Sequence, residues 1–182
     1  CIRDRLRRES YLNLNGPWEY AITRENAEPE EYDGEIIVPF APESELSGVG
    51  RTLKPGEYLW YRRELVLPEG FNVGRVLLHF GAVDQCARVW VNGEDACAHT
   101  GGYLGFSADI TELLYAEGEA NEILVRVTDD TDKSYHTRGK QKLKPGGIWY
   151  TPVSGIWQTV WCESVPENYI RALYILSLIH IS

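Results

Sequence analysis

Residues 86–99 have the sequence CARVWVNGEDACAH, which predicts two strands joined by a tight turn. Small apolar residues occupy every second position from Ala87 to Val91, and a period of two is typical of a strand with one buried face. Asn92 and Gly93 both tolerate a positive φ, so this pair is a strong signal for a two-residue hairpin turn. The segment therefore predicts antiparallel β structure.

The same period of two recurs in residues 18–23, 76–80 and 123–128. The chain is also rich in turn formers and aromatic residues, with 17 Gly, 9 Pro, 11 Tyr and 6 Trp. No segment keeps a helical period of 3.6 residues. Many short strands joined by turns, without intervening helices, predict an all-β fold, either an antiparallel sandwich or a jelly roll.

Length and composition exclude several classes of protein. A chain of 182 residues with 43% hydrophobic and 25% charged residues is typical of one soluble globular domain. The net charge of −9 argues against a nucleic-acid partner, whose binding surface would be basic. No apolar run reaches the length of a membrane span, so we expect no membrane partner.

The cysteine pattern predicts neither a metal site nor a disulfide framework. Cys1, Cys86, Cys97 and Cys162 include no CxxC pair, and no histidine lies at the spacing of a zinc ligand. We therefore expect free thiols. Sparse, unpaired cysteines favour a reducing compartment, which predicts a cytoplasmic protein.

The two ends of the chain carry separate expectations. The sequence contains no Met and begins at Cys1, so we expect a processed chain or a fragment. Residues 176–182, LSLIHIS, match the translation of a transposon-end adapter used in sequencing libraries. The expected organisation is a partial N-terminal segment at 1–9, a sandwich domain at 10–165, and a truncated end at 166–182 with the adapter-derived tail from about 176.

Eight short segments occur in an order that resembles a known family. They are LNLNGPWEY (12–20), WYRR (60–63), HFGAVD (79–84), VWVNG (89–93), HTGGY (99–103), FSADIT (106–111), NEILVRV (121–127) and SGIWQ (154–158). The series resembles the N-terminal sugar-binding domain of glycoside hydrolase family 2, which includes bacterial β-galactosidases and β-glucuronidases. The resemblance extends from about Ser10 to Val165.

The resemblance implies a fold and a role. The fold is a jelly-roll β-sandwich like a galactose-binding domain. In this family it precedes an immunoglobulin-like sandwich and a (β/α)₈ barrel, whose two glutamates hydrolyse terminal β-glycosides with retention. Such a barrel needs about 250 residues, so it does not fit in this chain. We therefore expect a non-catalytic domain of a truncated glycosidase, inactive alone and without catalytic residues of its own.

The implied partners follow from the family. They are the missing downstream sandwich and barrel, and a carbohydrate, either a β-galactoside or a β-glucuronide, in the intact enzyme. Family members often form homo-oligomers through this domain, and their bacterial members lead us to expect a bacterial cytoplasmic protein.

Two other functions stay open at this point. One is a free-standing carbohydrate-binding module without hydrolase activity, because jelly rolls often carry such sites and a fold does not decide a function. The other is a purely structural interaction domain that makes no sugar contact.

Asp129 and Asp130 follow the strand predicted at residues 123–128. In β-galactosidases of the family, an aspartate after the corresponding strand reaches the active site of the barrel and holds the sugar and a monovalent cation. The resemblance therefore implies substrate binding by Asp129 or Asp130, and cation binding by Asp129, as a site completed in the parent enzyme. A carboxylate suits this role because it accepts hydrogen bonds from two sugar hydroxyls. The alternative is an acidic turn in solvent.

Residues 134–147 form a long polar segment in which basic residues are frequent. The segment RGKQ at 138–141, with Arg138 and Lys140, resembles the loop that projects toward the substrate pocket in many family members, and an arginine suits pairing with a sugar acid or a carboxylate. Long ordered loops in compact domains are often functional. The alternative is a solvated loop that is disordered without the barrel.

The tryptophans divide into two groups. Trp149 is a candidate platform on which a sugar ring stacks, with packing as the alternative. Trp157 alternates with Trp161, which favours a place in the core or at a domain interface. For Trp90, cross-strand packing is favoured.

Isolated polar residues receive no catalytic role. His79, His99 and His136 are far apart in sequence and form no recognisable Ser/His/Asp arrangement, and neither Ser107 nor Ser154 lies in a nucleophile motif. The acidic run at residues 28–35 is interpreted as a solvated loop, because a carboxylate pair within one polar loop lacks the opposed geometry of glycoside hydrolysis.

Overall fold

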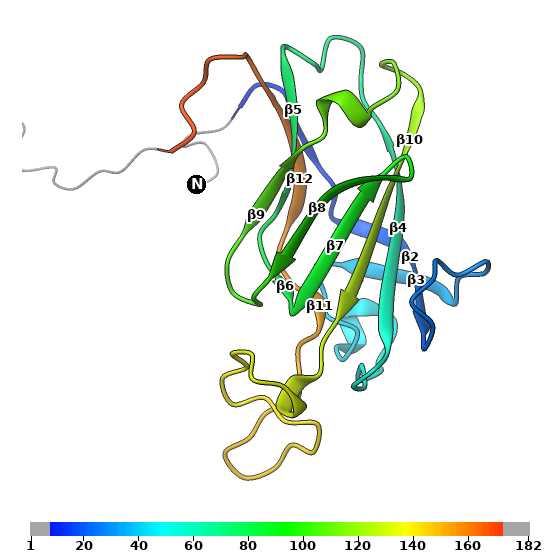
Figure 1. Ribbon diagram of the computed structural model, residues 1–182, viewed down its shortest axis with the longest axis vertical. Coiled ribbons are helices and arrows are strands. Elements are labelled where there is room, and N and C mark those ends of the chain that lie inside the picture. Colours follow the sequence, from blue (N-terminus) through cyan, green and yellow to red (C-terminus); the bar gives the residue numbers. More distant parts are fainter. Residues whose placement is uncertain (1–7, 173–182) are drawn as a thin grey trace, which may run out of the picture.

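The structure, a computed structural model, describes residues 8–172 and arranges them as two layers of antiparallel strands (Figure 1). The expected adapter-derived tail at 176–182 and most of the expected N-terminal segment lie outside the described residues. The predicted all-β antiparallel sandwich is confirmed.

The larger layer is a six-stranded sheet with the strand order β3-β2-β4-β10-β7-β8. Its strands are β2 (Gly16–Thr23), β3 (Gly34–Val38), β4 (Tyr58–Val66), β7 (Cys86–Val91), β8 (Glu94–Thr100) and β10 (Ala120–Thr128). Strands far apart in sequence are therefore neighbours, with β10 pairing with β4 on one side and β7 on the other.

The smaller layer is a four-stranded sheet with the order β1-β12-β5-β9, and a short pair, β11-β6, lies beside the two sheets. These strands are β1 (Tyr11–Asn13), β5 (Arg75–Phe80), β6 (Val83–Asp84), β9 (Phe106–Asp109), β11 (Gly155–Ile156) and β12 (Val160–Val165). The helical elements of the described residues are single 3₁₀ turns: η2 (Glu45–Ser47), η3 (Thr111–Leu113) and η4 (Thr131–Lys133). No helix in this part of the chain is long and apolar enough to cross a membrane.

The hairpin predicted at residues 86–99 is confirmed. Strands β7 and β8 pair across Asn92 and Gly93, which have φ values of 52° and 80°. The mirror-image turn that suits the twist of a hairpin needs positive φ at both central residues. All four segments with a period of two form strands, namely β2, β5, β7 and β10.

The core lies between the two layers and explains which face of each strand is apolar. Trp18, Tyr61 and Phe80 are among its largest fully buried side chains. The Trp18 ring meets the Tyr61 ring edge to face, with centroids 6.3 Å apart, and its indole N–H donates to the Leu14 carbonyl at 2.8 Å. Complete burial of one such side chain stabilises the fold by about 2–3 kcal/mol.

A smaller cluster covers the outer face of the six-stranded sheet. Trp60 and Trp90 stack there with ring centroids 6.0 Å apart, and the Arg126 guanidinium lies over both rings. Tyr32 packs against the same cluster. The packing role predicted for Trp90 is thus confirmed.

Candidate functional site

The longest connection in the described chain runs from Asp129, after β10, to Ser154, before β11. This segment, called here the 129–154 loop, projects from one end of the sandwich (Figure 1). Within it, Lys142 N–H donates to the Tyr150 carbonyl at 3.0 Å, and Tyr150 N–H donates to the Lys140 carbonyl at 2.9 Å. Beyond the η4 turn and these contacts, the loop has little regular structure to hold it.

The Asp129 carboxylate joins the two ends of this loop. It is only 5% exposed. One oxygen accepts the Thr131 N–H at 2.7 Å, and the other accepts the Ser154 hydroxyl at 2.8 Å. A buried carboxylate without donors would cost free energy, so these bonds supply the donors that Asp129 needs. They also join the two ends of the loop at Asp129 and Ser154, a place called here the neck.

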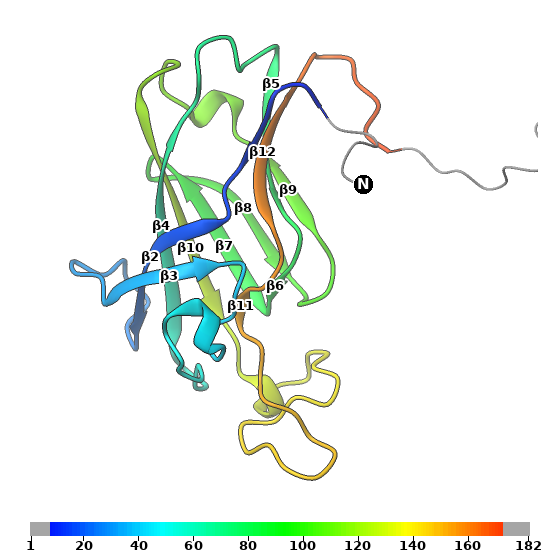
Figure 2. The same cartoon turned by 180° about the vertical axis from the view of Figure 1, so that it is seen from behind.

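Glu43 adds a second fixed point from a distant segment. Its carboxylate accepts the Ser154 N–H at 3.0 Å and the Leu53 N–H at 3.1 Å. Figure 2 shows the segment before η2 beside the β11 end of the molecule. One residue after Ser154, Gly155 has a positive φ of 73°, and Ile156 N–H donates to the buried Tyr61 hydroxyl at 3.1 Å.

Asp84 and Gln85 hold the middle of the loop. The Gln141 side chain donates to the Asp84 carboxylate at 3.3 Å and accepts the Val153 N–H at 2.6 Å. The Gln85 side chain donates to the Thr137 carbonyl at 3.0 Å. Asp84 and Gln85 are both 3% exposed, so these anchors are rigid parts of the sandwich.

Burial raises the proton affinity of two carboxyls at the neck, Asp84 and Glu43. Burial and, after it, the Asp129 charge raise the pKa of Asp84 to about 7, although the hydrogen bond from Gln141 partly offsets the rise. Burial also raises the pKa of Glu43, against the lowering effect of the N–H groups of Ser154 and Leu53. Near pH 7 Asp84 is therefore divided between the neutral and the charged form.

The fold and the anchored loop can be compared with known proteins. Residues 49–166 match the family model described as glycosyl hydrolases family 2, sugar binding domain. This chain belongs to that family.

The relatives that match this chain include proteins named as β-glucuronidases and one named as a β-galactosidase. A putative β-glucuronidase of Formosa agariphila is 33% identical over 116 residues, which are 64% of this chain and 13% of that protein. A β-galactosidase of Thermoanaerobacter pseudethanolicus is 31% identical over 64% of this chain and 15% of its own length. Human β-glucuronidase is 35% identical over 51% of this chain and 14% of its length. The chain thus matches a small part of each of these relatives.

Solved family 2 structures have the same fold. A β-glucuronidase from Ruminococcus gnavus superposes with a TM-score of 0.67 at 22% identity, covering 89% of this chain and 29% of that one. The β-glucuronidase from Dictyoglomus thermophilum gives a TM-score of 0.63 at 22% identity, covering 88% and 29%. The predicted family membership is confirmed.

The five residues predicted for substrate binding lie in different surroundings. Asp129 is buried at the neck, so the alternative of an acidic turn in solvent is wrong for this residue. Asp130 is exposed and accepts the Gly56 N–H at 3.3 Å. Arg138 is half-buried, whereas Lys140 is exposed on the loop. Trp149, the fifth residue, has the Lys142 ammonium 4.0 Å from the centre of its ring. The roles of all five residues as sugar contacts stay predictions.

The cation role of Asp129 also stays a prediction. Within residues 8–172, no three His, Cys, Asp or Glu side chains are placed to hold a metal ion together. Both Asp129 oxygens already accept hydrogen bonds from Thr131 and Ser154. The neck therefore fits a cation poorly as it stands, because the ion would have to share these oxygens with protein donors.

Exposed apolar side chains gather on the loop and beside it. Tyr135, Ile148 and Tyr150 are 93%, 64% and 64% exposed. Tyr103, which is 50% exposed, meets the Trp157 ring edge to face, and the Trp157 N–H donates to the Gly102 carbonyl at 2.8 Å. Trp157 is therefore packed, as predicted, whereas Tyr135, Ile148 and Tyr150 leave most of their apolar surface exposed.

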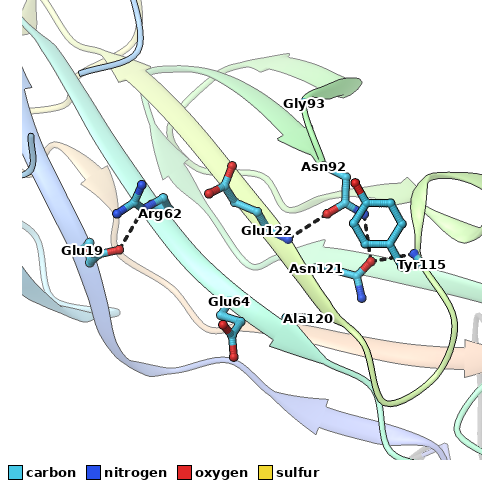
Figure 3. Close-up of a pocket in the computed structure, with 9 residues that line it drawn as sticks. All are labelled: Glu19, Arg62, Glu64, Asn92, Gly93, Tyr115, Ala120, Asn121 and Glu122. Atoms are coloured by element: carbon cyan, nitrogen blue, oxygen red, sulfur yellow. Dashed lines mark hydrogen bonds and ion pairs between the residues drawn. The ribbon is translucent and has the colours of Figure 1, made fainter. Parts of the chain in front are cut away.

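A cavity lies elsewhere, at the far end of β10 on the outer face of the six-stranded sheet (Figure 3). It has a volume of about 600 Å³. Asn92 and Asn121 use their amide groups to brace its wall, where Asn92 donates to Asn121 at 2.8 Å and Tyr115 N–H donates to Asn121 at 2.7 Å. None of the predicted site residues lines this cavity, so it is no part of the 129–154 site.

Sequence reasoning missed Glu43, Asp84 and Gln85, and it singled out Gln141 only as part of the segment at 138–141. Each is an ordinary polar residue in sequence, and no motif joins positions this far apart. Two segments quoted for the family resemblance point near the neck, because HFGAVD ends at Asp84 and SGIWQ begins at Ser154.

Proposed function

We propose that this chain is the non-catalytic front domain of a family 2 glycosidase that hydrolyses terminal β-glycosides with retention, and that the 129–154 loop is its contribution to the substrate pocket. The observation that carries the proposal is the set of buried anchors at the neck. Glu43, Asp84 and Asp129 hold a polar loop that has no apolar core of its own.

The cost of holding this loop supports a functional role. Fixing the backbone of one residue costs about 1–2 kcal/mol of conformational entropy. Buried carboxyls, one with its pKa raised to about 7, are an expensive means of supplying anchors. A domain that needed only to fold would do better with a short turn, so the length and fixation of the loop favour a use at its tip.

The side chains of the loop favour two contact partners, a sugar and the barrel domain of the parent enzyme. Arg138 and Lys140 offer donors to sugar oxygens or to a carboxylate, and Trp149 offers an aromatic face. Tyr135, Ile148 and Tyr150 offer apolar area for the barrel that would complete the pocket. Retaining hydrolysis needs two carboxyls about 5 Å apart across the scissile bond, which we assign to that barrel.

The test uses the 182-residue chain with methyl β-D-galactoside and methyl β-D-glucuronide as probes. We expect no turnover of the corresponding p-nitrophenyl glycosides. We expect weak binding, with a Kd of about 1 mM or more, and amide NMR shifts confined to residues 129–154. Trp149→Ala and Lys140→Ala should weaken the binding, and Arg24→Ala, a change on an exposed residue of another loop, should not.

Two outcomes would redirect the proposal. Turnover of the p-nitrophenyl glycosides by the pure chain would overturn its role as a domain without glycosidase activity, and shifts mapped outside the loop would overturn the assigned site. A Kd in the micromolar range would favour the free-standing carbohydrate-binding module. The DNA downstream of codon 165 decides the parent protein, because the proposal requires a second sandwich and a barrel with two strand-end glutamates.

We also propose a cytoplasmic location. It is supported by Cys86, Cys97 and Cys162, which are free thiols in the structure. Cell fractionation with an antibody to the chain would test it, and recovery in a secreted fraction would contradict it.

A further inference from the structure

A chain of polar side chains crosses the outer face of the four-stranded sheet and includes no residue of the 129–154 loop. His79 on β5 lies directly opposite Ser107 on β9 in the strand register, and its Nδ1 is 2.8 Å from the Ser107 hydroxyl oxygen. On its other side, His79 Nε2 is 3.1 Å from a carboxylate oxygen of Glu163 on β12. Three neighbouring strands thus bring a serine, a histidine and a glutamate into one line.

The histidine ring is held firmly in this position. It stacks on Trp161, with ring centroids 4.8 Å apart and planes 10° apart. Glu163 is fixed in turn, because it accepts the Trp161 indole N–H at 3.2 Å and the Arg8 guanidinium N–H at 3.1 Å. The His79 and Glu163 side chains are only 15% and 17% exposed, whereas Ser107 is exposed. The reactive hydroxyl would therefore face solvent from a rigid support.

One tautomer of His79 suits both of its neighbours, Ser107 and Glu163. If Ser107 donates its proton to Nδ1, the ring proton is on Nε2 and faces Glu163. That N–H does not point straight at the carboxylate oxygen, so Glu163 acts on the ring by its charge rather than by a linear hydrogen bond. Burial lowers the pKa of His79, which Glu163 raises and Arg8 lowers, so the ring is neutral and able to accept a proton near pH 7.

A cavity of about 430 Å³ opens directly on these three residues. Arginines gather in its lining, although the chain as a whole carries a net charge of −9. Arg8 is paired with Glu163, and Arg75 with Asp109 at 3.0 Å. Arg171 also lines the cavity, and no acceptor for it is found among residues 8–172. A guanidinium that lines the same cavity as an exposed serine suits the negative oxygen that forms during acyl transfer.

We propose that Ser107, His79 and Glu163 form a second site that hydrolyses small carboxylic esters, with Ser107 as nucleophile, His79 as general base and Glu163 as the positioning residue. Here Nδ1 faces the serine and Nε2 faces the carboxylate, whereas in the serine-protease triad Nε2 faces the serine and Nδ1 the carboxylate. Either ring nitrogen can accept the proton of the serine. The sequence hid this arrangement, because residues 79, 107 and 163 meet only through strand register.

The reaction balances with an ester and water alone. The Ser107 oxygen bonds to the ester carbonyl carbon while its proton passes to His79, and the carbonyl electrons move to the carbonyl oxygen, which Arg171 of the cavity would stabilise. The carbon–oxygen bond to the alcohol breaks, and the alcohol leaves with the proton from His79. Water repeats both steps, giving the carboxylic acid and restoring the Ser107 hydroxyl.

The first experiment treats the full 182-residue chain with a fluorophosphonate and locates the adduct by peptide mass spectrometry. We expect one adduct, on Ser107, and turnover of p-nitrophenyl acetate that Ser107→Ala lowers at least about 100-fold. His79→Gln should slow labelling at least about 10-fold. Ser10→Ala, a change at a serine beside β1 outside the line, should leave both readouts unchanged.

Glu163→Gln separates positioning from mere packing. Because the Glu163 charge raises the pKa of His79, its removal should move the rising limb of the pH–rate profile to lower pH while turnover falls. A purely structural role would lower the rate without moving that limb, and would contradict the assignment of Glu163.

The proposal fails if the folded chain gives no adduct on Ser107, or if Ser107→Ala retains turnover. Circular dichroism establishes that each variant is folded. Where Ser107→Ala is not folded, Ser107→Cys takes its place and should lose the fluorophosphonate adduct but gain alkylation by iodoacetamide at residue 107. These readouts need no sugar, so their failure leaves the proposed glycosidase role untouched.

Discussion

Strands β4 and β10 pair from Leu59–Val127 to Val66–Ala120 and bury apolar side chains between the sheets. The 129–154 loop has almost no such core and depends on buried polar anchors from Glu43, Asp84 and Asp129. The strands are stabilised by non-directional burial of area, whereas the loop is stabilised by a few directional bonds. Changes in the sheets should therefore act on the whole molecule, and changes at the neck should act first on the loop.

The largest effect should come from the core. Trp18→Ala removes a side chain that is 1% exposed and should lower the free energy of unfolding by about 3–5 kcal/mol. Urea denaturation followed by circular dichroism measures this loss. A loss below about 1 kcal/mol would contradict the claim that burial of apolar side chains is what stabilises the sheets.

A smaller effect is expected where the neck meets the core. In Gly155→Ala the new methyl group would overlap the Tyr61 hydroxyl, so it adds overpacking of about 1–3 kcal/mol to the strain of a positive φ. Gly147→Ala, within the 129–154 loop, is the matched control, because its φ of 61° is also positive but no atom lies within 4 Å of the added carbon. Equal losses of stability in the two variants would contradict the close packing at residue 155.

The pH dependence tests the proton held at the neck. The pKa of Asp84 is about 7 in the folded chain, against about 4 for a free aspartate. The folded state therefore binds this proton more tightly, and stability should fall as pH rises from about 4 to about 7. Asp84→Asn should flatten this fall in urea denaturation between pH 5 and 8. Asp130→Asn, at an exposed position, should leave it in place, and an unchanged slope in Asp84→Asn would contradict the interpretation.

The smallest effect should come from the tip of the loop. Lys142→Gln removes the ammonium that lies over the Trp149 ring, a contact of about 0.5 kcal/mol at a partly exposed site. Global stability should hardly change, but amide hydrogen exchange of residues 140–150 should become faster. Equal acceleration in β4 and β10 would mean that the loop and the sheets open together, and would contradict the separate stabilisation of the loop.

The sheets were predictable from sequence because their signals are local. A period of two marks β2, β5, β7 and β10, and Asn92–Gly93 marks the turn between β7 and β8 without reference to any distant residue. The neck was not predictable, because Glu43, Asp84 and Ser154 come together only after the sheets have formed. Asp129 was singled out from sequence, but its burial and its bond to Ser154 were not, since both depend on where β11 begins.

Strands β1 and β12 are antiparallel neighbours, with Tyr11 opposite Glu163, and the segments before and after them leave together at the end opposite the 129–154 loop (Figures 1 and 2). This geometry has a mechanical consequence. A force that pulls the two segments apart would load the hydrogen bonds between β1 and β12 one after another, as a zipper opens, instead of shearing them all at once. The pair should yield at low force, while the neck at the other end bears none of the load.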